Sequence, residues 1–559
     1  MKKSAFVFLT LAWLSLAQSN GTQESAKLKL SQLKIQSTVT GLLQYAASGD
    51  LNTVKLLIAS GIGINQQDDI NAATALHNAA ALGHLDMVKW LVNNNANVDI
   101  KDNHGYTALD WAKYKENKKV VNYLKQQQKS YGISQKTVLD YSKVIENTWV
   151  KLPQSSFHDW KKADSQAQDI IKQWKLNSVT LPWTKLQLKK YIKHKMMPSR
   201  GARGLALTHV AMHDALVFSH EASKNKTALD MQLTVSMAAA SVLAYLFPAE
   251  ESAFKRIVHS MAAQLYSTEH DNLSDNAKKA MTIGQHIANR VIKYAENDGA
   301  QRGWNGTRLQ WYGEGRWYGP GSWEPTPPYF YYPPEEPYAP TWKTWVLKNA
   351  KQYRPIPPPK YGSDAFNTAL KEVIDVNKNL TTDQLKSAKF WVDGHGTITP
   401  AGHWNQIAID TIVKNKNRKF NNLEIAQMFV NLNIAMADTY VAAWDSKYHY
   451  WSIRPITAAQ KLWGIKLKPA ILTPPFPSYV SGHAATSGAG SQIMAWFFPK
   501  QASEFIALGN QAAMSRLYGG IHYRFDNDQG LILGRKIADT TTSYFANKIK
   551  QSNNLNNNQ

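Results

Sequence analysis

The segment Pro477-Ser478-Tyr479-Val480-Ser481-Gly482-His483 places a hydroxyl group, a glycine and a histidine side by side. The backbone N–H groups at Ser481–His483 can donate to a ligand, because the glycine lets the chain approach it closely. The adjacent imidazole of His483 can act as a general acid or base. This stretch therefore forms one part of a candidate site, and its partners lie on either side of it in the sequence.

Cationic side chains lie on both sides of this segment in the sequence. Six residues separate Lys447 from Arg454 upstream, and Arg516 lies downstream, ahead of His522 and Asp526. Arg and Lys bind oxyanions through charge-assisted hydrogen bonds. On a helix, the four-residue spacing of His522 and Asp526 would place the carboxylate one turn from the ring, where it fixes the imidazole tautomer. The set predicts a site for a tetrahedral oxyanion.

The pattern K-x6-RP, PS-x2-SGH and SR-x5-H-x3-D resembles the superfamily that joins vanadium-dependent haloperoxidases with type 2 phosphatidic acid phosphatases and bacterial acid phosphatases. The resemblance implies an all-α, helical-bundle enzyme domain over residues 138–548, with its active-site motifs in 444–539. It also implies catalytic roles for His522, His483 and Asp526. His522 would ligate vanadate or attack phosphorus, and His483 would be the acid/base. The residues implied to bind vanadate or phosphate are Lys447, Arg454, Ser481, Gly482 and Arg516.

The same residues fit two reactions, since phosphate and vanadate share shape and charge. Trp444 and Phe476 match aromatic positions that line the halide pocket of fungal chloroperoxidases. They favour a haloperoxidase that uses a vanadate cofactor and hydrogen peroxide to oxidise a halide. The length of the region 135–548 favours it too. The alternative is an acid phosphatase, a phosphomonoesterase or phosphatidic acid phosphatase-like enzyme, which acts on a phosphoester without a cofactor and with His522 as nucleophile.

An internal repeat precedes the enzyme region. Residues 46–51 align with 80–85 at an offset of 34, and 74–77 align with 107–110 at an offset of 33. Over 41–126 the repeat resembles the ankyrin repeat, a helical solenoid that implies a protein partner. A third interpretation is therefore an ankyrin-mediated binding protein with an accessory enzyme domain. We expect a linker at 127–137 and a disordered tail at 549–559.

The N-terminus has the pattern of a signal peptide over residues 1–17. Lys2 and Lys3 precede an apolar stretch, Ala5–Leu16, which ends at the small-residue cleavage site Ser15-Leu16-Ala17. We therefore expect an exported protein, periplasmic or secreted. The most apolar later stretch, Leu233–Phe247, carries polar residues and predicts a buried helix, so we expect no transmembrane segment in the mature chain.

Composition describes a globular chain of 559 residues, with 43% hydrophobic and 19% charged residues. The net charge is +23, but Lys and Arg are scattered along the chain, so no nucleic-acid partner is predicted. With no Cys, the chain forms no disulfide.

Two further features have more than one interpretation, and a third is set aside. Trp304–Trp345 is dense in Trp, Tyr, Pro and Gly, which predicts an ordered loop over the enzyme or a surface that stacks on carbohydrate or peptide. His209 and Asp214 fall on a predicted helix, as a satisfied buried pair or a proton relay. His395 and His403 lack the i,i+4 spacing of a zinc pair, so no zinc site is predicted there.

Overall fold

The computed structural model describes residues 26–133, 165–174, 178–224, 230–266, 273–300, 319–415, 420–498 and 501–556, apart from positions 27, 34, 61, 69, 70, 95, 97 and 99. No β-strand is assigned within these ranges, so the all-α prediction is confirmed. The chain divides into two compact units, residues 1–140 and 141–559. The expected signal peptide lies outside the described residues.

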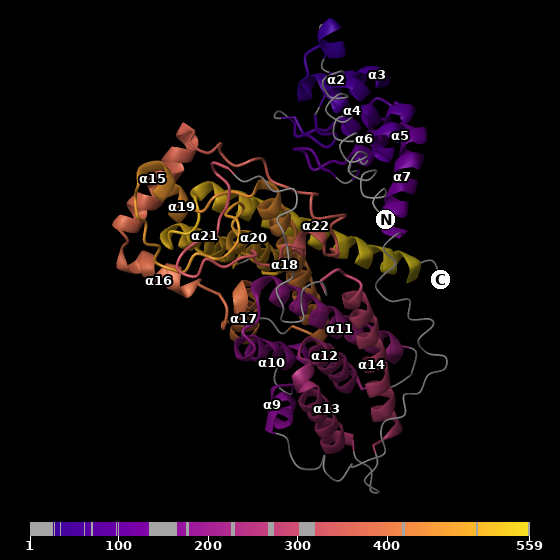
Figure 1. Cartoon of the computed structure of the whole chain (residues 1–559). Coiled ribbons are helices and arrows are strands. Elements are labelled where there is room, and N and C mark those ends of the chain that lie inside the picture. The colour runs from indigo at the N-terminus through magenta and orange to yellow at the C-terminus, as the bar shows by residue number, and fades with distance from the viewer. Residues whose placement is uncertain are drawn as a thin grey trace, which may run out of the picture. The chain divides into compact units, whose positions relative to one another are not determined.

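The first unit is a stack of helix pairs (Figure 1). α2 packs against α4, and α4 against α6, so equivalent helices of successive repeats lie side by side. Thr74 and Thr107 cap the first helix of two repeats with a capping box. The helices are α2 (Val39–Ser48), α3 (Leu51–Ala59), α4 (Ala75–Ala81), α5 (Leu85–Asn93), α6 (Ala108–Tyr114) and α7 (Lys118–Ile133). The last helix continues through residues 127–133, where the sequence predicted a linker.

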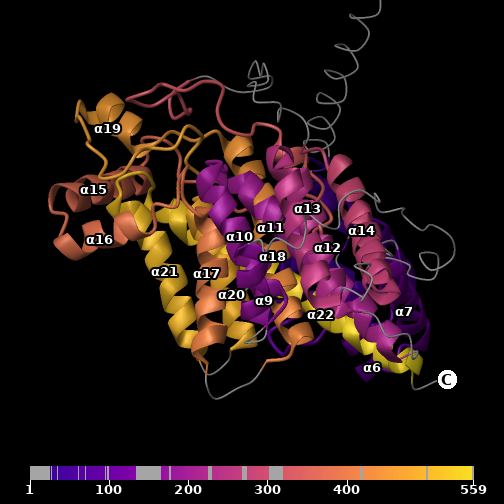
Figure 2. The same cartoon turned by 90° about the horizontal axis from the view of Figure 1, so that it is seen from below.

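The second unit begins with a bundle that surrounds one buried helix, α12, which packs against α11, α13 and α14 (Figure 2). Residues Leu233–Leu243 of α12 are all buried, which agrees with the buried helix predicted from their sequence. Among the described residues, no helix is long and apolar enough to cross a membrane. These helices are α9 (Ser165–Trp174), α10 (Thr180–Lys193), α11 (Pro198–Lys224), α12 (Met231–Leu246), α13 (Glu251–Tyr266) and α14 (Asp275–Glu296).

The C-terminal half of this unit contains the predicted motifs. Its helices are α15 (Asp364–Lys378), α16 (Thr382–Phe390), α17 (Thr399–Lys414), α18 (Asn422–Tyr450), α19 (Pro455–Trp463), α20 (Gly482–Phe497), α21 (Ala502–Tyr518) and α22 (Arg524–Asn556). α22 extends to Asn556, so the tail expected to be disordered is helical over 549–556. Once a helix is nucleated, each further residue adds a hydrogen bond, and the helix can propagate beyond its packed part.

α20 and α22 approach each other through glycines. A Cβ atom built on Gly534 would lie 1.9 Å from the carbonyl oxygen of Ala485, and one on Gly488 would lie 2.5 Å from that of Leu531. The backbones of the two helices are therefore in contact. At their N-terminal ends, the N–H of Ser481 donates to the carbonyl of the first-turn residue Asp526 at 3.0 Å. This contact fixes the two motif segments relative to each other.

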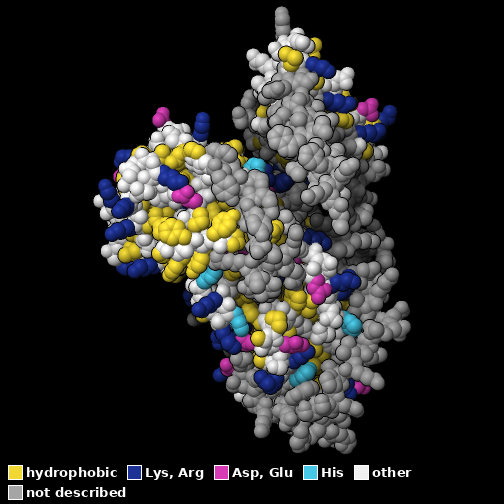
Figure 3. Space-filling view, viewed as in Figure 1, with side chains coloured by type: hydrophobic (Ala, Val, Ile, Leu, Met, Phe, Trp, Pro, Cys, Tyr) yellow, Lys and Arg dark blue, Asp and Glu magenta, His cyan; other side chains and the backbone are white. Residues whose placement is uncertain are grey.

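The described part of the aromatic segment, residues 319–345, is an ordered loop held to the enzyme. The N–H of Trp323 donates to the carbonyl of Trp451 at 2.8 Å, and that of Glu335 donates to Pro475 at 3.1 Å. Hydrophobic side chains gather on the surface of the C-terminal part of this unit (Figure 3). Residues 304–318 of the predicted loop lie outside the described ranges.

Candidate functional site

His522 stands two residues before α22, and Asp526 lies in the first turn of that helix. The Nδ1 of His522 is 2.7 Å from Oδ2 of Asp526, and the hydroxyl of Ser478 donates to the same oxygen. Because the carboxylate accepts, Nδ1 carries the hydrogen. Arg454 Nη1 donates to Nε2 of His522 at 3.0 Å, which places a lone pair on Nε2. The ring is therefore held in the tautomer that can attack or coordinate.

Lys447 lies on the last turn of α18 and its side chain is fully buried. Its Nζ donates to the carbonyls of Pro477 and Ser478, each at 2.9 Å. Burial and the nearby Arg454 guanidinium lower the pKa of Lys447 well below its ordinary value. A bound anion would oppose both effects, because it stabilises the charged ammonium.

Arg454, the N-terminal cap of α19, has an incompletely paired guanidinium. Its Nε donates to the carbonyl of Phe476 and its Nη1 to that of Ile521, each at 2.8 Å. Its Nη2 is buried and has no hydrogen-bond partner among the described residues. A buried N–H group without an acceptor costs about 1–3 kcal/mol. This orphaned donor indicates a place for a ligand acceptor.

Arg516 and His483 complete the polar site from α21 and α20. The Nη2 of Arg516 donates to the carbonyl of Ala388 at 3.1 Å. The Nε2 of His483 donates to the carbonyl of Val392 at 3.1 Å, so its Nδ1 is the acceptor. Burial, and then the Arg516 charge, lower the pKa of His483 well below its ordinary value. His483 is therefore neutral and can accept a proton.

The start of α20 brings a hydroxyl and the N–H groups of a first helical turn to the same place. Ser481 caps the helix, and its Oγ accepts from the N–H of Ala484 at 3.3 Å. A Cβ on Gly482 would lie 3.3 Å from Cζ3 of Trp444 and 3.9 Å from Cε of Lys447. The N-terminal turn of a helix carries N–H groups without intrahelical partners and favours anions.

The two aromatic residues predicted for the halide pocket contact each other and the cations. The ring centroids of Trp444 and Phe476 are 5.1 Å apart. The Nζ of Lys447 lies 4.9 Å from the Phe476 centroid, and the Cζ of Arg454 lies 5.1 Å from it. The indole N–H of Trp444 donates to the carbonyl of Glu335 at 3.1 Å. An aromatic wall therefore borders the anion site.

The charges of the site do not balance. Burial raises the pKa of Asp526 to about 6. Burial, followed by Arg454 and Lys447, lowers the pKa of His522 well below its ordinary value. Three buried cations thus face two carboxylates, Asp526 and Asp393, and two neutral imidazoles. An oxyanion fits this donor set.

The structure brings the predicted residues together, but sequence reasoning missed the groups that orient them. Ser478 lies within the segment Pro477–His483, and its position next to Pro477 was the feature of the sequence that could have drawn attention to its hydroxyl. The carbonyls of Ala388 and Val392 carried no signal, because any residue supplies a carbonyl. Their contacts depend on how α16 and the following loop pack against α20 and α21.

The predicted pair of His209 with Asp214 is wrong, because each of these residues has a different partner. Nδ1 of His209 lies 2.8 Å from the Leu205 carbonyl, and its Nε2 is 3.0 Å from Oγ1 of Thr184. The histidine that contacts Asp214, at 3.1 Å, is His213. Burial lowers the pKa of His209 to about 4, as expected for a buried neutral ring. His209 and Asp214 are five residues apart, and only residues three or four apart are neighbours on one face of a helix, so the adjacent His213 reaches the carboxylate instead.

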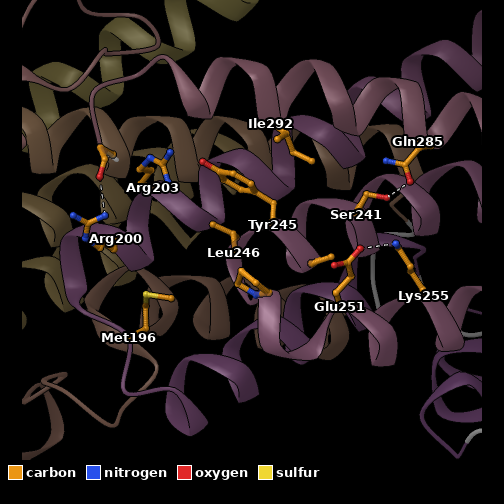
Figure 4. A pocket seen from close by; sticks show the side chains of 13 residues that line it. Met196, Arg200, Arg203, Ser241, Tyr245, Leu246, Glu251, Lys255, Gln285 and Ile292 are labelled. Atoms are coloured by element: carbon orange, nitrogen blue, oxygen red, sulfur yellow. Dashed lines mark hydrogen bonds and ion pairs between the residues drawn. The ribbon is translucent and has the colours of Figure 1, made fainter. Parts of the chain in front are cut away.

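A cavity of about 610 Å³ lies elsewhere, among α11, α12, α13 and α14 (Figure 4). Arg200 and Arg203 line it, but Glu336 and Asp298 pair with their guanidinium groups. None of the predicted site residues lines this cavity. Its cations are neutralised, so it does not compete with the anion site as the candidate active site.

Comparisons with known proteins agree with both parts of the chain. Residues 42–136 match the family of ankyrin repeats in three copies, and residues 427–505 and 500–551 match the VCPO second helical-bundle domain. A bacterial vanadium-dependent iodoperoxidase of known structure superposes with a TM-score of 0.55 at 25% sequence identity, covering 65% of this chain and 95% of that one.

Two curated relatives match shorter stretches. The chain is 28% identical over 138 residues to the vanadium chloroperoxidase of Curvularia inaequalis, which is 21% of this chain and 23% of the relative. It is 37% identical over 99 residues to the liver isoform of mitochondrial glutaminase from Rattus norvegicus, 18% of this chain and 16% of that protein. The chain thus spans less than a quarter of the length of either relative.

The second unit therefore has the helical fold of the vanadium haloperoxidases. The chain therefore carries ankyrin repeats and, after them, a domain that matches the VCPO second helical-bundle domain, and its neighbours of known structure are vanadium haloperoxidases.

Proposed function

We propose that this protein is a vanadate-dependent haloperoxidase that catalyses H2O2 + X⁻ + H⁺ → HOX + H2O, where X⁻ is a halide. The observation that carries the proposal is the unpaired Nη2 of Arg454 beside the Nε2 lone pair of His522. The site thus offers an oxyanion both a buried donor and a ligating atom. The likeness to a bacterial iodoperoxidase over 95% of that chain supports the proposal.

Vanadate, when bound, would supply the electrophilic centre that activates peroxide toward the halide. The residues that would hold it are Lys447, Arg454, Arg516, Ser481 and the N–H of Gly482, with Nε2 of His522 as the ligand. The Nδ1 of His483 would take a proton from peroxide and return it to the leaving oxygen. Asp526 would hold His522 in the required tautomer.

Halide would bind at the aromatic wall formed by Trp444 and Phe476. Both rings contact the cation Lys447, at 5.9 and 4.9 Å from Nζ to the centroids. The ammonium would attract the halide, while the rings exclude water from it.

An acid phosphatase is the second candidate, because the neutral His522 has a lone pair on Nε2, which now accepts from Arg454 and could also attack phosphorus. The Nε2–P bond would form as the P–O bond to the alcohol breaks, and a proton taken up beforehand at Nδ1 of His483 would pass to that oxygen. Water would then hydrolyse the phosphohistidine, and no cofactor would be needed.

A paired assay of the purified protein separates the two reactions. We expect vanadate to activate peroxide-dependent halide oxidation and phosphate to compete with vanadate for the same cations. A phosphatase would instead be inhibited by vanadate, which imitates the five-coordinate transition state. The variant His522→Ala should lose either activity, and a fully active variant would contradict the assigned site. Phosphoester hydrolysis without halide oxidation would overturn the haloperoxidase proposal.

We also propose export of the chain through residues 1–17, followed by a periplasmic or secreted location, because of the sequence pattern there. Recovery of the protein from the periplasm or medium, with an N-terminus near Gln18, would test it. The ankyrin repeats would bind a protein partner. If the second unit lacks any catalysis in the paired assay, an ankyrin-mediated binding protein becomes the better proposal.

A further inference from the structure

A second pair of a histidine and a carboxylate lies beside the anion site. His403, in the first turns of α17, has its Nδ1 3.0 Å from Oδ2 of Asp393 and 3.2 Å from Oδ1. The side chains are 12% and 7% exposed, respectively. Because the carboxylate accepts, Nδ1 of His403 carries the hydrogen and Nε2 keeps its lone pair. This arrangement repeats that of His522 and Asp526, but no predicted role uses it.

One short segment, Ala388–Asp393, joins this pair to the site. The carbonyl of Ala388 accepts from Arg516 at 3.1 Å, and that of Val392 accepts from His483 at 3.1 Å. The last residue of the segment is the carboxylate of the second pair. The same backbone therefore orients two site residues and the additional imidazole.

The surroundings of His403 restrict where its proton can go. Trp391 stacks on its ring with centroids 4.4 Å apart, and Phe390 lies edge-on at 4.8 Å. The charged and titratable groups that face the pair are Arg516 and Tyr440, which interact with Asp393, and His483, which interacts with His403. Of these groups, neutral His483 is the one with a free basic nitrogen.

The proposed reaction needs a proton route. Each turnover consumes one proton, whereas the Nε2 of His483 is bound to a carbonyl and only its Nδ1 can exchange. His403 keeps part of its side chain in solvent, and the Asp393 carboxylate lies beside its ring at 3.0 Å.

We propose that Asp393 and His403 form a proton relay that returns a proton from solvent to His483 in each turnover. Nε2 of His403 takes a proton from solvent, and Asp393 holds the resulting imidazolium. The Nε2–H bond then breaks as an N–H bond forms at Nδ1 of His483, directly or through water, and His403 becomes neutral again. The inference rests on the proposed haloperoxidase function. His403 is a positioning residue in this scheme, since it acts through His483.

The first test is His403→Gln, which keeps a hydrogen bond to Asp393 but cannot titrate. We expect the rate of halide oxidation to fall about tenfold and to recover with added imidazole. The solvent isotope effect should rise, while the vanadate Kd stays within about twofold of the native value. The matched control is His395→Gln, because His395 also contacts a carboxylate, Glu335, at 3.0 Å, yet is 51% exposed. The control should behave like the native protein.

Full turnover in His403→Gln, or a loss that imidazole does not restore, would overturn the relay. A second measurement needs no vanadate and no activity. In ¹⁵N imidazole spectra, His403 should carry its hydrogen on Nδ1, and Asp393→Leu should weaken that tautomer preference, because the acceptor at 3.0 Å is removed. The opposite tautomer, or an unchanged preference in the variant, would overturn the pair itself. If the spectra show the expected tautomer but the protein oxidises no halide, the proposed function would be overturned, and with it the role of the pair in supplying protons.

Discussion

Replacing Asp526 by Leu and by Asn separates the two things that this carboxylate supplies, an acceptor and a negative charge. Leu removes the acceptor of His522 Nδ1–H at 2.7 Å, of the Ser478 hydroxyl, and of the Tyr523 N–H at 3.3 Å. If the imidazole switched tautomer to avoid burying Nδ1–H, its Nε2–H would face Nη1 of Arg454 at 3.0 Å, donor against donor. Asn removes the charge, but its amide oxygen can take the place of Oδ2.

The expected loss of anion affinity follows from these contacts. Losing the partner that orients a ligating histidine typically weakens binding about 10–100-fold, or about 1.4–2.7 kcal/mol. We therefore expect Asp526→Leu to weaken vanadate and phosphate binding by about that factor, and Asp526→Asn by less than about tenfold. Ser478→Ala removes one donor to Oδ2 and leaves the His522 contact in place, so it serves as the milder control.

Isothermal titration calorimetry with vanadate and with phosphate measures the effect, after circular dichroism shows that each variant is folded. The order of affinity should be native, then Asn, then Leu. The reasoning would be refuted by a folded Leu variant that binds within twofold of the native protein. It would also be refuted if Asn bound more weakly than Leu, because charge rather than orientation would then dominate.

Four further outcomes are expected. Phe476→His should change the relative kcat/KM for chloride, bromide and iodide, and an unchanged preference would place the halide elsewhere. Deletion of residues 18–130 should leave halide oxidation nearly intact; a truncated protein that folds but is inactive would contradict the independence of the enzyme unit. Gly534→Ala should lower the free energy of unfolding by about 1–3 kcal/mol or more in denaturant titrations, because its Cβ would meet backbone, and a native-like Tm would refute that contact. Burial opposes ionisation of Glu250, but hydrogen bonds from Lys190 and its neighbours outweigh it and lower the Glu250 pKa to about 2. The stabilisation that ionised Glu250 gives the folded state is therefore complete above pH 4.5, the pKa in the unfolded state, and is lost as the pH falls toward 2. Across that window, the free energy of unfolding should depend less on pH in Glu250→Gln than in the native protein.

The sequence predicted the helical class, which is confirmed. It also selected the residues of a candidate anion site, because cations, histidines and a helix-capping serine are individually recognisable; the structure brings these residues together, and their role stays a prediction. It also predicted that His522 and Asp526 would meet, although His522 precedes the helix rather than lying on it. It did not predict Val392 or Ala388, whose contribution is a carbonyl and is independent of side chain. Nor did it pair His403 with Asp393, because Asp393 lies in a loop and His403 in α17, ten positions further along the chain, and no periodicity relates such positions.

The glycine contact between α20 and α22 divides the site into a rigid part and an adjustable one. The starts of these helices carry Ser481 and Asp526, and the helices below them touch through main-chain atoms that have no rotamers to exchange. The relative position of Ser481 and Asp526 therefore does not depend on the side chains of the surrounding walls. Trp444 and Phe476 belong to those walls. Single substitutions there could thus alter substrate preference while Ser481 and Asp526 keep their alignment.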